Sequence, residues 1–260
     1  MAMIAMTSGR AAPGVTTSVA LLATVWPTPV VVADLDPAGG DLTTGWCNGS
    51  SNDGPRWADR SVVSFALESR RTDGSLSTGL AEHLRPVAGV PNCRFLAGLI
   101  DPTHLSFVMS EWSRLSRALA EVSRPGRGVD VLVDCGRFGA DTPLSVLAAA
   151  DLVLIGVRPD RRQGVAARYL AGQLRPIVPV EKLGLVVCAT STLRTLELEQ
   201  QVGVCADIEL PNDARIAEVF ANGGRRPLRW QRSRLVRKAH DTAARLHTVL
   251  NEQRQPTTMI

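Results

Sequence analysis

The chain opens with Met1-Ala-Met-Ile-Ala-Met-Thr-Ser-Gly-Arg10-Ala-Ala-Pro-Gly14-Val15-Thr16-Thr17-Ser-Val-Ala-Leu-Leu-Ala23 and soon continues Val30-Val-Val-Ala-Asp34-Leu-Asp36-Pro-Ala-Gly-Gly-Asp41-Leu42. A short apolar run ends in a loop of small residues, an apolar helix-like stretch follows, and a β-branched run ends in two carboxylates. A loop that enters a helix exposes backbone N–H groups, and the helix dipole favours an anion there. The stretch is typical of the start of a nucleotide-binding α/β domain.

The rest of the chain alternates apolar runs of strand length with amphipathic stretches. Strands are expected over 2–7, 30–33, 92–98, 129–134, 183–188 and 207–210 and after Ala150, with a long loop over 39–60. Helices are expected over 15–25, 61–69, 76–84, 102–122, 164–174, 193–201, 214–221 and 233–251. This alternation predicts an α/β fold with a doubly wound, mostly parallel sheet of about seven or eight strands and helices on both faces.

A third landmark is Val129-Asp130-Val-Leu-Val-Asp134-Cys135-Gly136, a β-branched strand that ends in a carboxylate. In a nucleotide-binding domain such a carboxylate holds the shell of a Mg²⁺ ion through water. The simpler alternative is that Asp134 caps the following helix. Asp34 and Asp36 have a similar alternative, as strand-end residues that form turns or caps, and the first loop could be a tight β–α turn without a ligand.

Together these motifs resemble the ParA/MinD family of deviant Walker A ATPases, and the resemblance covers most of the chain. The family loop, K-G-G-x-G-K-T-T, aligns with Arg10-Ala11-Ala12-Pro13-Gly14-Val15-Thr16-Thr17. Its D-x-D-P segment aligns with Asp34 to Pro37, its Walker B strand with the run that ends at Asp134, and its late L-P-x-D turn with Leu210 to Asp213.

The resemblance implies roles for these residues. ATP would bind to residues 11–17, with Pro211 and Asp213 on the adenine side. Mg²⁺ would be held by Thr16, Asp34 and Asp134, through water at the two carboxylates. Asp36 and Arg10 would be catalytic, and Asp36 would position the attacking water. The family's adenine-reading Asn after the strand over 183–188 has no counterpart in Cys188-Ala189-Thr190-Ser191.

The loop departs from the family at the position that matters most, because the lysine that should hold the β- and γ-phosphates is Val15. The family's second lysine, which reaches the nucleotide of a dimer partner, is Arg10, which keeps the charge. Pro13 removes one N–H donor. A lost charge-assisted contact costs roughly 1.5–3 kcal/mol in binding. The sequence therefore predicts a weak or slow ATPase, or a pseudo-ATPase.

Composition sets further limits. At 260 residues with 45% hydrophobic and 21% charged residues, the chain is expected to form one domain over 1–255, followed by a disordered tail over 256–260. The chain contains no apolar run of 18 residues, so the sequence predicts no membrane span. Five cysteines without C-x-x-C spacing indicate buried thiols in a reducing compartment, and the start of the chain lacks the pattern of a signal peptide, so a cytoplasmic location is expected.

Positive charge is concentrated at the C-terminal end. Residues 225–260 contain nine basic and two acidic residues, whereas the rest of the chain contains 20 basic and 23 acidic ones. Six arginines are candidate contacts for DNA phosphates: Arg225, Arg226, Arg229, Arg232, Arg234 and Arg237. A solvated arginine-rich face explains the same charge equally well.

Three classes of function remain open. The first is a positioning or partitioning protein that binds ATP, forms a homodimer and binds DNA without sequence preference, with a ParB-like or secretion-system partner. The second is a nucleotide-independent scaffold like the TadZ/CpaE branch, which localises pilus or secretion machinery. The third, an active metabolic P-loop enzyme, is disfavoured by the missing lysine. An apolar stripe over 233–251 could attach the chain to a membrane, but packing on the sheet explains the stripe equally well.

Overall fold

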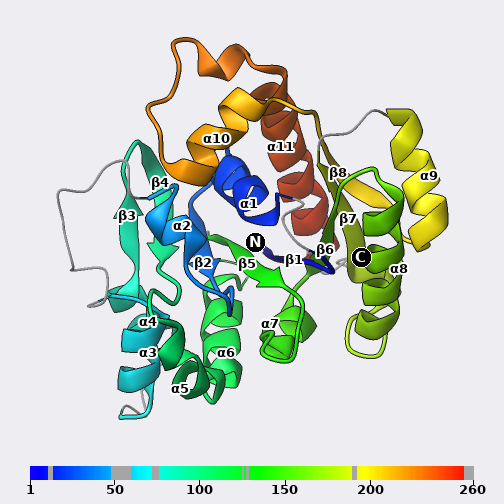
Figure 1. Ribbon diagram of the computed structural model, residues 1–260. Helices are drawn as coiled ribbons and strands as arrows, with labels where there is room; N and C mark the ends of the chain where they lie inside the picture. Colours follow the sequence, from blue (N-terminus) through cyan, green and yellow to red (C-terminus); the bar gives the residue numbers. More distant parts are fainter. Residues whose placement is uncertain are drawn as a thin grey trace, which may run out of the picture.

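The computed structural model describes residues 1–10, 14–47, 60–71, 76–124, 126, 129–188 and 192–254. Within these residues one eight-stranded sheet runs through the molecule in the order β3-β4-β2-β5-β1-β6-β7-β8 (Figure 1). The strands are β1 (Met3–Ser8), β2 (Val30–Asp34), β3 (Arg85–Val87), β4 (Val90–Leu96), β5 (Asp130–Arg137), β6 (Leu152–Val157), β7 (Leu183–Cys188) and β8 (Ala206–Leu210).

All neighbouring strands are parallel except β3, which pairs antiparallel with β4 at the sheet edge. The predicted α/β fold with a mostly parallel sheet of seven or eight strands is therefore confirmed. The sequence did not predict β3, because three residues that include Pro86 carry little strand signal. Proline lacks an N–H donor, so it is tolerated at an edge such as this one.

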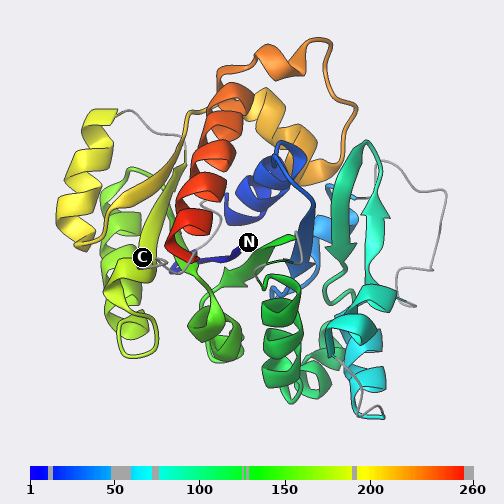
Figure 2. The ribbon, with the colours of Figure 1, turned by 180° about the vertical axis from the view of Figure 1, so that it is seen from behind.

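The helices are α1 (Val15–Thr24), α2 (Asp41–Thr44), α3 (Val62–Ser69), α4 (Leu76–His83), α5 (Leu105–Met109), α6 (Trp112–Val122), α7 (Leu144–Ala149), α8 (Arg161–Leu174), α9 (Thr192–Val202), α10 (Ala214–Asn222) and α11 (Arg234–Arg254). Short 3-10 turns lie at Pro102–His104, Val180–Lys182 and Trp230–Arg232. Figures 1 and 2 show α1, α10 and α11 together on one side of the sheet and α3, α6 and α7 on the other.

Side-chain alternation along each buried strand divides the core into two layers. On β1, Met3 and Ala5 join the apolar cluster under α3 and α6–α9, whereas Ile4 and Met6 join the cluster under α1, α10 and α11. Strands that are covered on both faces need apolar residues at every position, which is why the sequence shows continuous apolar runs. The same alternation turns Asp34 and Asp134 toward the face that carries α1.

Two sequence predictions were wrong in detail. The segment 39–60, predicted to be a loop, contains the short helix α2. The fully buried Leu42 side chain holds this single helical turn against the core. The helix predicted over 102–122 is broken into a 3-10 turn, α5 and α6. The break at Ser110–Glu111 accompanies the burial of the Glu111 carboxylate, whose Oε1 lies 2.6 Å from Arg70 Nε. Periodicity alone does not reveal such a buried ion pair.

Helix α11 packs the predicted apolar stripe onto the sheet. Leu235, Val236, Ala239, Ala243, Leu246 and Leu250 are all buried in the core cluster under α1. No helix of the described residues combines the length and apolarity that crossing a bilayer requires. The predicted tail over 256–260 lies outside the described residues, and the expectation of a single domain over 1–255 stays a prediction.

Candidate nucleotide-binding site

The β1–α1 connection brings the first turn of a helix to the carboxyl end of the central strands. Gly14 adopts φ +100° before α1, a left-handed conformation that side chains rarely adopt. No side chain caps the helix there, and Ser18 instead donates its hydroxyl to Gly14 O at 2.7 Å. The uncapped first turn of a ten-residue helix is a suitable place for an anion.

Val15 is only 5% exposed and belongs to the apolar cluster under α1. Its side chain therefore contributes to the core as well as to the wall of the site. Thr16 and Thr17, in the same turn, are partly exposed. Ala11, Ala12 and Pro13, which the sequence assigns to the same loop, lie outside the described residues.

Two carboxylates stand side by side at the ends of neighbouring parallel strands, because Asp34 on β2 is in register with Asp134 on β5. Asp34 is 1% exposed, and its oxygens accept backbone N–H groups from Asp36 at 3.4 Å and Leu42 at 3.3 Å. Burial, and then the charge of Asp134, raise the pKa of Asp34 well above its usual value. As placed, Asp34 shapes the loop that follows β2.

One oxygen of the Asp134 carboxylate is hydrogen-bonded and the other is not. Its Oδ1 accepts the Gly136 N–H at 2.9 Å, whereas the buried Oδ2 has no hydrogen-bond partner among the described residues. Burial raises the pKa of Asp134 to about 6, although the nearby Thr16 hydroxyl favours the charged form. The Thr16 hydroxyl therefore lies close to the Asp134 carboxylate. An orphaned buried oxygen beside a threonine hydroxyl is suited to a cation or its water shell.

Asp36 lies just beyond β2 and faces the end of β5. Burial raises the pKa of Asp36, and the charge of Asp41 raises it further. The Ala38 N–H, which donates to Oδ1 at 2.8 Å, and the charge of Arg137 act in the opposite direction. Gly136 has φ +58°, and a Cβ atom there would collide with the Asp36 carboxyl group. A glycine at this position therefore lets the two loops meet.

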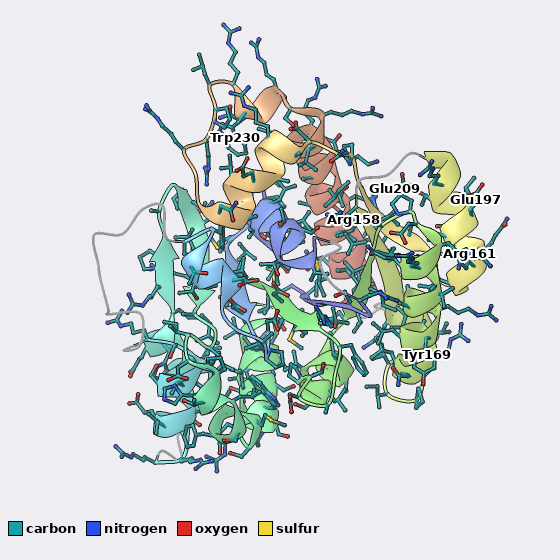
Figure 3. The ribbon with its side chains drawn as sticks, viewed as in Figure 1. Arg158, Arg161, Tyr169, Glu197, Glu209 and Trp230 are labelled. Carbon is teal, nitrogen blue, oxygen red and sulfur yellow. The ribbon has the colours of Figure 1, made fainter. Side chains whose placement is uncertain are left out.

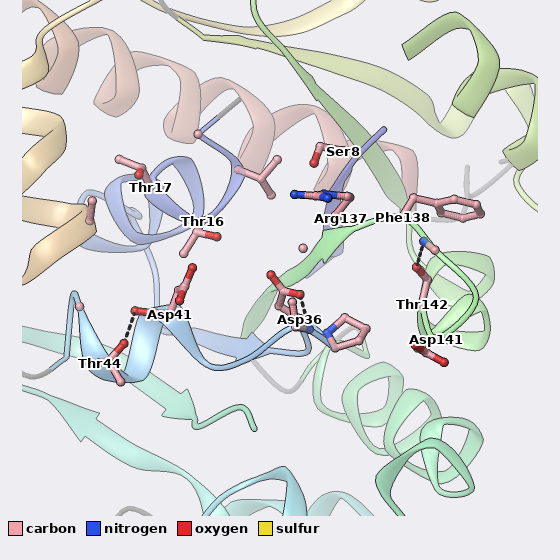
Figure 4. A pocket seen from close by; sticks show the side chains of 18 of the residues that line it. Ser8, Thr16, Thr17, Asp36, Asp41, Thr44, Arg137, Phe138, Asp141 and Thr142 are labelled. Carbon is pink, nitrogen blue, oxygen red and sulfur yellow. Dashed lines mark hydrogen bonds between the residues drawn. The ribbon is translucent and has the colours of Figure 1, made fainter. Parts of the chain in front are cut away.

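A cleft of about 900 Å³ lies at the carboxyl end of the sheet, and several of these residues line it (Figure 4). Its wall includes Ser8, Gly14, Val15, Thr16, Thr17, Asp36, Pro37, Ala38, Asp41, Thr44, Gly136, Arg137, Phe138, Asp141, Thr142, Arg158 and Asn222. Ligands of doubly wound sheets bind in this position, outside the carboxyl ends of the strands. The cleft thus brings together Gly14, Val15, Thr16, Thr17 and Asp36, with Asp134 buried next to it.

Other predicted site residues lie elsewhere. Arg10 lines hollows beside α8, with Arg162 in both, rather than the main cleft. Gly9 passes so close to α8 that a Cβ would lie 2.9 Å from Ala166 O, which directs the chain to that side. Asp213 caps α10 through Ile216 N at 3.2 Å and accepts the Ser233 hydroxyl at 2.7 Å.

Neither Asp213 nor Pro211 lines the cleft.

The cleft also contains two residues that the sequence reasoning did not select, Arg137 and Arg158. The available signal was an arginine close behind each of two apolar strands, since side chains that follow parallel strands gather at the same edge.

The residues present fit a Mg²⁺ ion that takes most of its ligands from phosphate and water. Within the described part of the chain, no three His, Cys, Asp or Glu side chains come together as a metal site. One threonine hydroxyl and one carboxylate are what the protein would contribute to magnesium held on nucleotide phosphates. The Thr16 hydroxyl and the unpaired Oδ2 of Asp134 provide that pair.

The C-terminal arginines lie on the segment that joins α10 to α11, which contains Trp230 (Figure 3), and on the first turn of α11. We refer to residues 225–237 as the projection. Arg225, Arg229, Arg232, Arg234 and Arg237 are exposed. Arg226 is half-buried: its guanidinium stacks 4.9 Å from the centre of the Trp230 ring and donates to Gly89 O at 3.3 Å. Five of the six predicted DNA contacts are thus presented to solvent, and the sixth holds the projection onto the β3–β4 turn.

No protein-family model and no curated protein sequence matches the chain, whereas solved structures do. A ParA family ATPase from Chlorobium tepidum TLS matches with a TM-score of 0.71 and 17% identity over 94% of this chain and 98% of that one. The cell division ATPase MinD of Pyrococcus furiosus matches with a TM-score of 0.73 and 16% identity, over 95% and 99%.

A putative plasmid partition protein from Borrelia burgdorferi B31, bound to AMPPNP, matches with a TM-score of 0.70 and 12% identity over 95% of this chain and 98% of that one. The sheet order, the uncapped β1–α1 turn and the strand-end carboxylates define a P-loop NTPase type of fold. Within that class, the chain has the ParA/MinD-like fold.

Proposed function

We propose that this chain is a ParA/MinD-like positioning or partitioning protein that binds a nucleoside polyphosphate with Mg²⁺ and hydrolyses it slowly or not at all. The observation that carries the proposal is the cleft itself, where the first turn of α1, Asp36 and the open oxygen of Asp134 meet around a loop whose lysine position is Val15. Binding groups are present, while the main counter-charge of phosphoryl transfer is missing from the loop.

Structural neighbours support the nucleotide part of the proposal. The Borrelia protein was solved with AMPPNP, a MinD from Pyrococcus horikoshii OT3 with Mg-ADP, and a variant of Cyanothece McdA with ATP. We extend to this chain the binding of ATP or ADP with Mg²⁺ through Gly14, Thr16, Thr17 and Asp134. Asp36 would position water, and Arg10, on the α8 side, would face a partner in a homodimer.

Partner binding completes the proposed role. The five exposed arginines of the projection suit DNA phosphates, and a ParB-like or secretion-system protein would be the regulator or cargo. A MinC:MinD complex from Aquifex aeolicus is among the structural neighbours. A cytoplasmic location suits the five free cysteines.

The second candidate is a nucleotide-independent scaffold for a pilus or secretion machinery. Val15 favours it, because a loop without its lysine has lost a contact worth on the order of 10- to 100-fold in affinity.

Calorimetric titration of Mg-ATP and Mg-ADP into the purified protein, with a turnover assay, tests the proposal. We expect binding with a dissociation constant in the micromolar range or weaker, weakened further in Thr16→Ala, and little turnover. Thr248→Ala, on the exposed side of α11, is the control. Absence of binding at millimolar nucleotide, with an unchanged dimer, would favour the scaffold; rapid hydrolysis would contradict the slow-ATPase part.

A further inference from the structure

Two arginines flank the loop that lost its lysine. Strand β1 lies between β5 and β6, and its last residue, Ser8, is in register with Arg137 on one side and with Gly156 on the other. Arg137 ends β5, and Arg158 follows β6 directly. Both residues line the cleft. The two strands next to β1 therefore each deliver one guanidinium group to the mouth of the β1–α1 loop.

Neither guanidinium is committed to the protein. Both side chains are exposed, and no hydrogen bond or ion pair of either guanidinium group is present within the described residues. The charge of Arg137 reaches Asp36, whose pKa it lowers against the effect of burial, but the two groups form no ion pair. In Figure 4 the Arg137 side chain lies beside Ser8, above Asp36 and between Thr16 and Phe138.

Arg158 acts on the other side of the loop. Its backbone N–H is fixed by Gln163 Oε1 at 2.9 Å, at the start of α8. Burial raises the pKa of the Cys188 thiol, and the positive charge of Arg158 partly offsets that rise. The Arg158 guanidinium therefore lies close enough to Cys188 to affect its pKa. Cys188 Sγ in turn lies 3.5 Å from the position of a Cβ on Gly14. The positive charge of Arg158 is thus close to the turn that enters α1.

We propose that Arg137 and Arg158 bind the phosphate chain of the nucleoside polyphosphate and replace, from the two flanking strands, the charge that the loop lost with Val15. The inference rests on the nucleotide-binding function proposed above and assigns the phosphate contacts within the same cleft. Two cations are needed there because Asp36, Asp41 and Asp141 also line it and would otherwise repel an anion.

Arginine suits this task better than a relocated lysine. Its guanidinium is always charged and offers a planar fork of donors that matches two phosphate oxygens at once. A guanidinium that reaches in from a strand end does not require a charged side chain at position 15. Val15 can then remain part of the apolar core.

The test uses Arg137→Gln, Arg158→Gln and the double variant, with Arg168→Gln as the matched control. Arg168 is an exposed arginine on α8 that does not line the cleft. Mg-ATP is titrated calorimetrically, and inorganic tripolyphosphate is used as a competitor. We expect each cleft variant to lose on the order of tenfold or more in affinity for both probes, and Arg168→Gln to bind as the unmodified chain does. Thermal melting should be unchanged, because both side chains are exposed.

The assignment is overturned if the cleft variants and the control lose Mg-ATP affinity equally, or if none of them loses any. In either case, nucleotide binding by the unmodified chain would still stand. No binding of Mg-ATP or Mg-ADP by the unmodified chain overturns the nucleotide-binding proposal itself, and the assignment with it. These two failures are therefore distinguishable.

A double-mutant cycle asks whether the arginines replace the lysine. Val15→Lys is introduced into the unmodified chain and into the Arg137→Gln/Arg158→Gln variant. If the charges are interchangeable, the lysine should improve Mg-ATP affinity by a larger factor in the double variant than in the unmodified chain. Equal gains in both backgrounds would contradict replacement.

Discussion

At the scale of the residue, the carboxylate of Asp134 sets a pH dependence. Burial raises the pKa of Asp134 to about 6 from 3.8, so between these values the folded protein binds more protons than the unfolded chain. The free energy of unfolding should therefore fall as pH rises through that window, since an ionised buried carboxylate opposes folding. For the protein without nucleotide or metal, we expect this group to contribute about 1 kcal/mol more stability at pH 5 than at pH 7.5.

Denaturant unfolding of the unmodified chain and of Asp134→Asn at both pH values checks this prediction. The amide removes the negative charge of Asp134 next to Asp34, so the variant should gain stability at pH 7.5 and lose most of the pH-dependent difference. Comparing the two proteins cancels other titrating groups, such as His83, whose pKa burial lowers. An identical pH profile in both proteins would contradict the raised pKa.

A second residue prediction concerns the contact between the β5 end and the β2 loop. Gly136→Ala places a Cβ against the Asp36 carboxyl group at φ +58°, so we expect a loss of roughly 1–3 kcal/mol in stability and weaker Mg-ATP binding. Gly139→Ala is the matched control, because Gly139 also lines the cleft and its Cβ would meet open space. Thermal melting and calorimetry of the two variants should separate them clearly.

At the scale of the element, Asp130 ties α11 to the sheet at the edge opposite the cleft. Its carboxylate, 1% exposed, accepts Ala2 N at 2.7 Å, Trp26 Nε1 at 2.9 Å, Thr28 Oγ1 at 2.9 Å and pairs with His247 Nδ1 at 2.8 Å. Asp130→Ala should cost roughly 3–5 kcal/mol, because two buried and two partly buried donors lose their acceptor.

The measurement is denaturant unfolding, with Mg-ATP affinity at a temperature where the variant is folded as the second readout. Affinity should stay within about twofold, because Asp130 lies at the amino end of β5 and the cleft at its carboxyl end. Asp241→Ala, on an exposed position of α11, should leave stability within about 0.5 kcal/mol. A large loss of affinity in Asp130→Ala would show that the two edges are coupled.

The elements also show what sequence reasoning reaches. Apolar runs and the loop-to-helix change placed β1, α1, β2 and β5 to within a few residues, because these patterns are local and strong. The pattern did not give the break before Trp112 or the edge strand around Pro86, since both depend on distant partners. In the same way Asp36 was found from its motif, whereas Arg137 and Arg158 required knowing that β5 and β6 flank β1.

At the scale of the whole molecule, charge divides the chain between an acidic body and a basic projection. If the projection binds DNA, retention on duplex DNA should be strong at low salt and fall steeply as salt rises. Each arginine that neutralises a phosphate contributes about −0.9 to the slope of log affinity against log salt. Five exposed arginines would therefore give a slope near −4.5 when all of them contact phosphate.

Charge reversal at Arg229, Arg232 and Arg234 should abolish retention at physiological salt, whereas reversal at Arg117, Arg161 and Arg168, exposed on α6 and α8, should leave the slope nearly unchanged. Both variants alter net charge equally, so a difference between them reports position rather than total charge. Fluorescence anisotropy with two unrelated DNA duplexes provides the measurement, because phosphate contacts predict equal affinity for both sequences. Equal losses in the two variants would assign the effect to net charge alone, and no retention of the unmodified chain at low salt would remove DNA from the proposed partners.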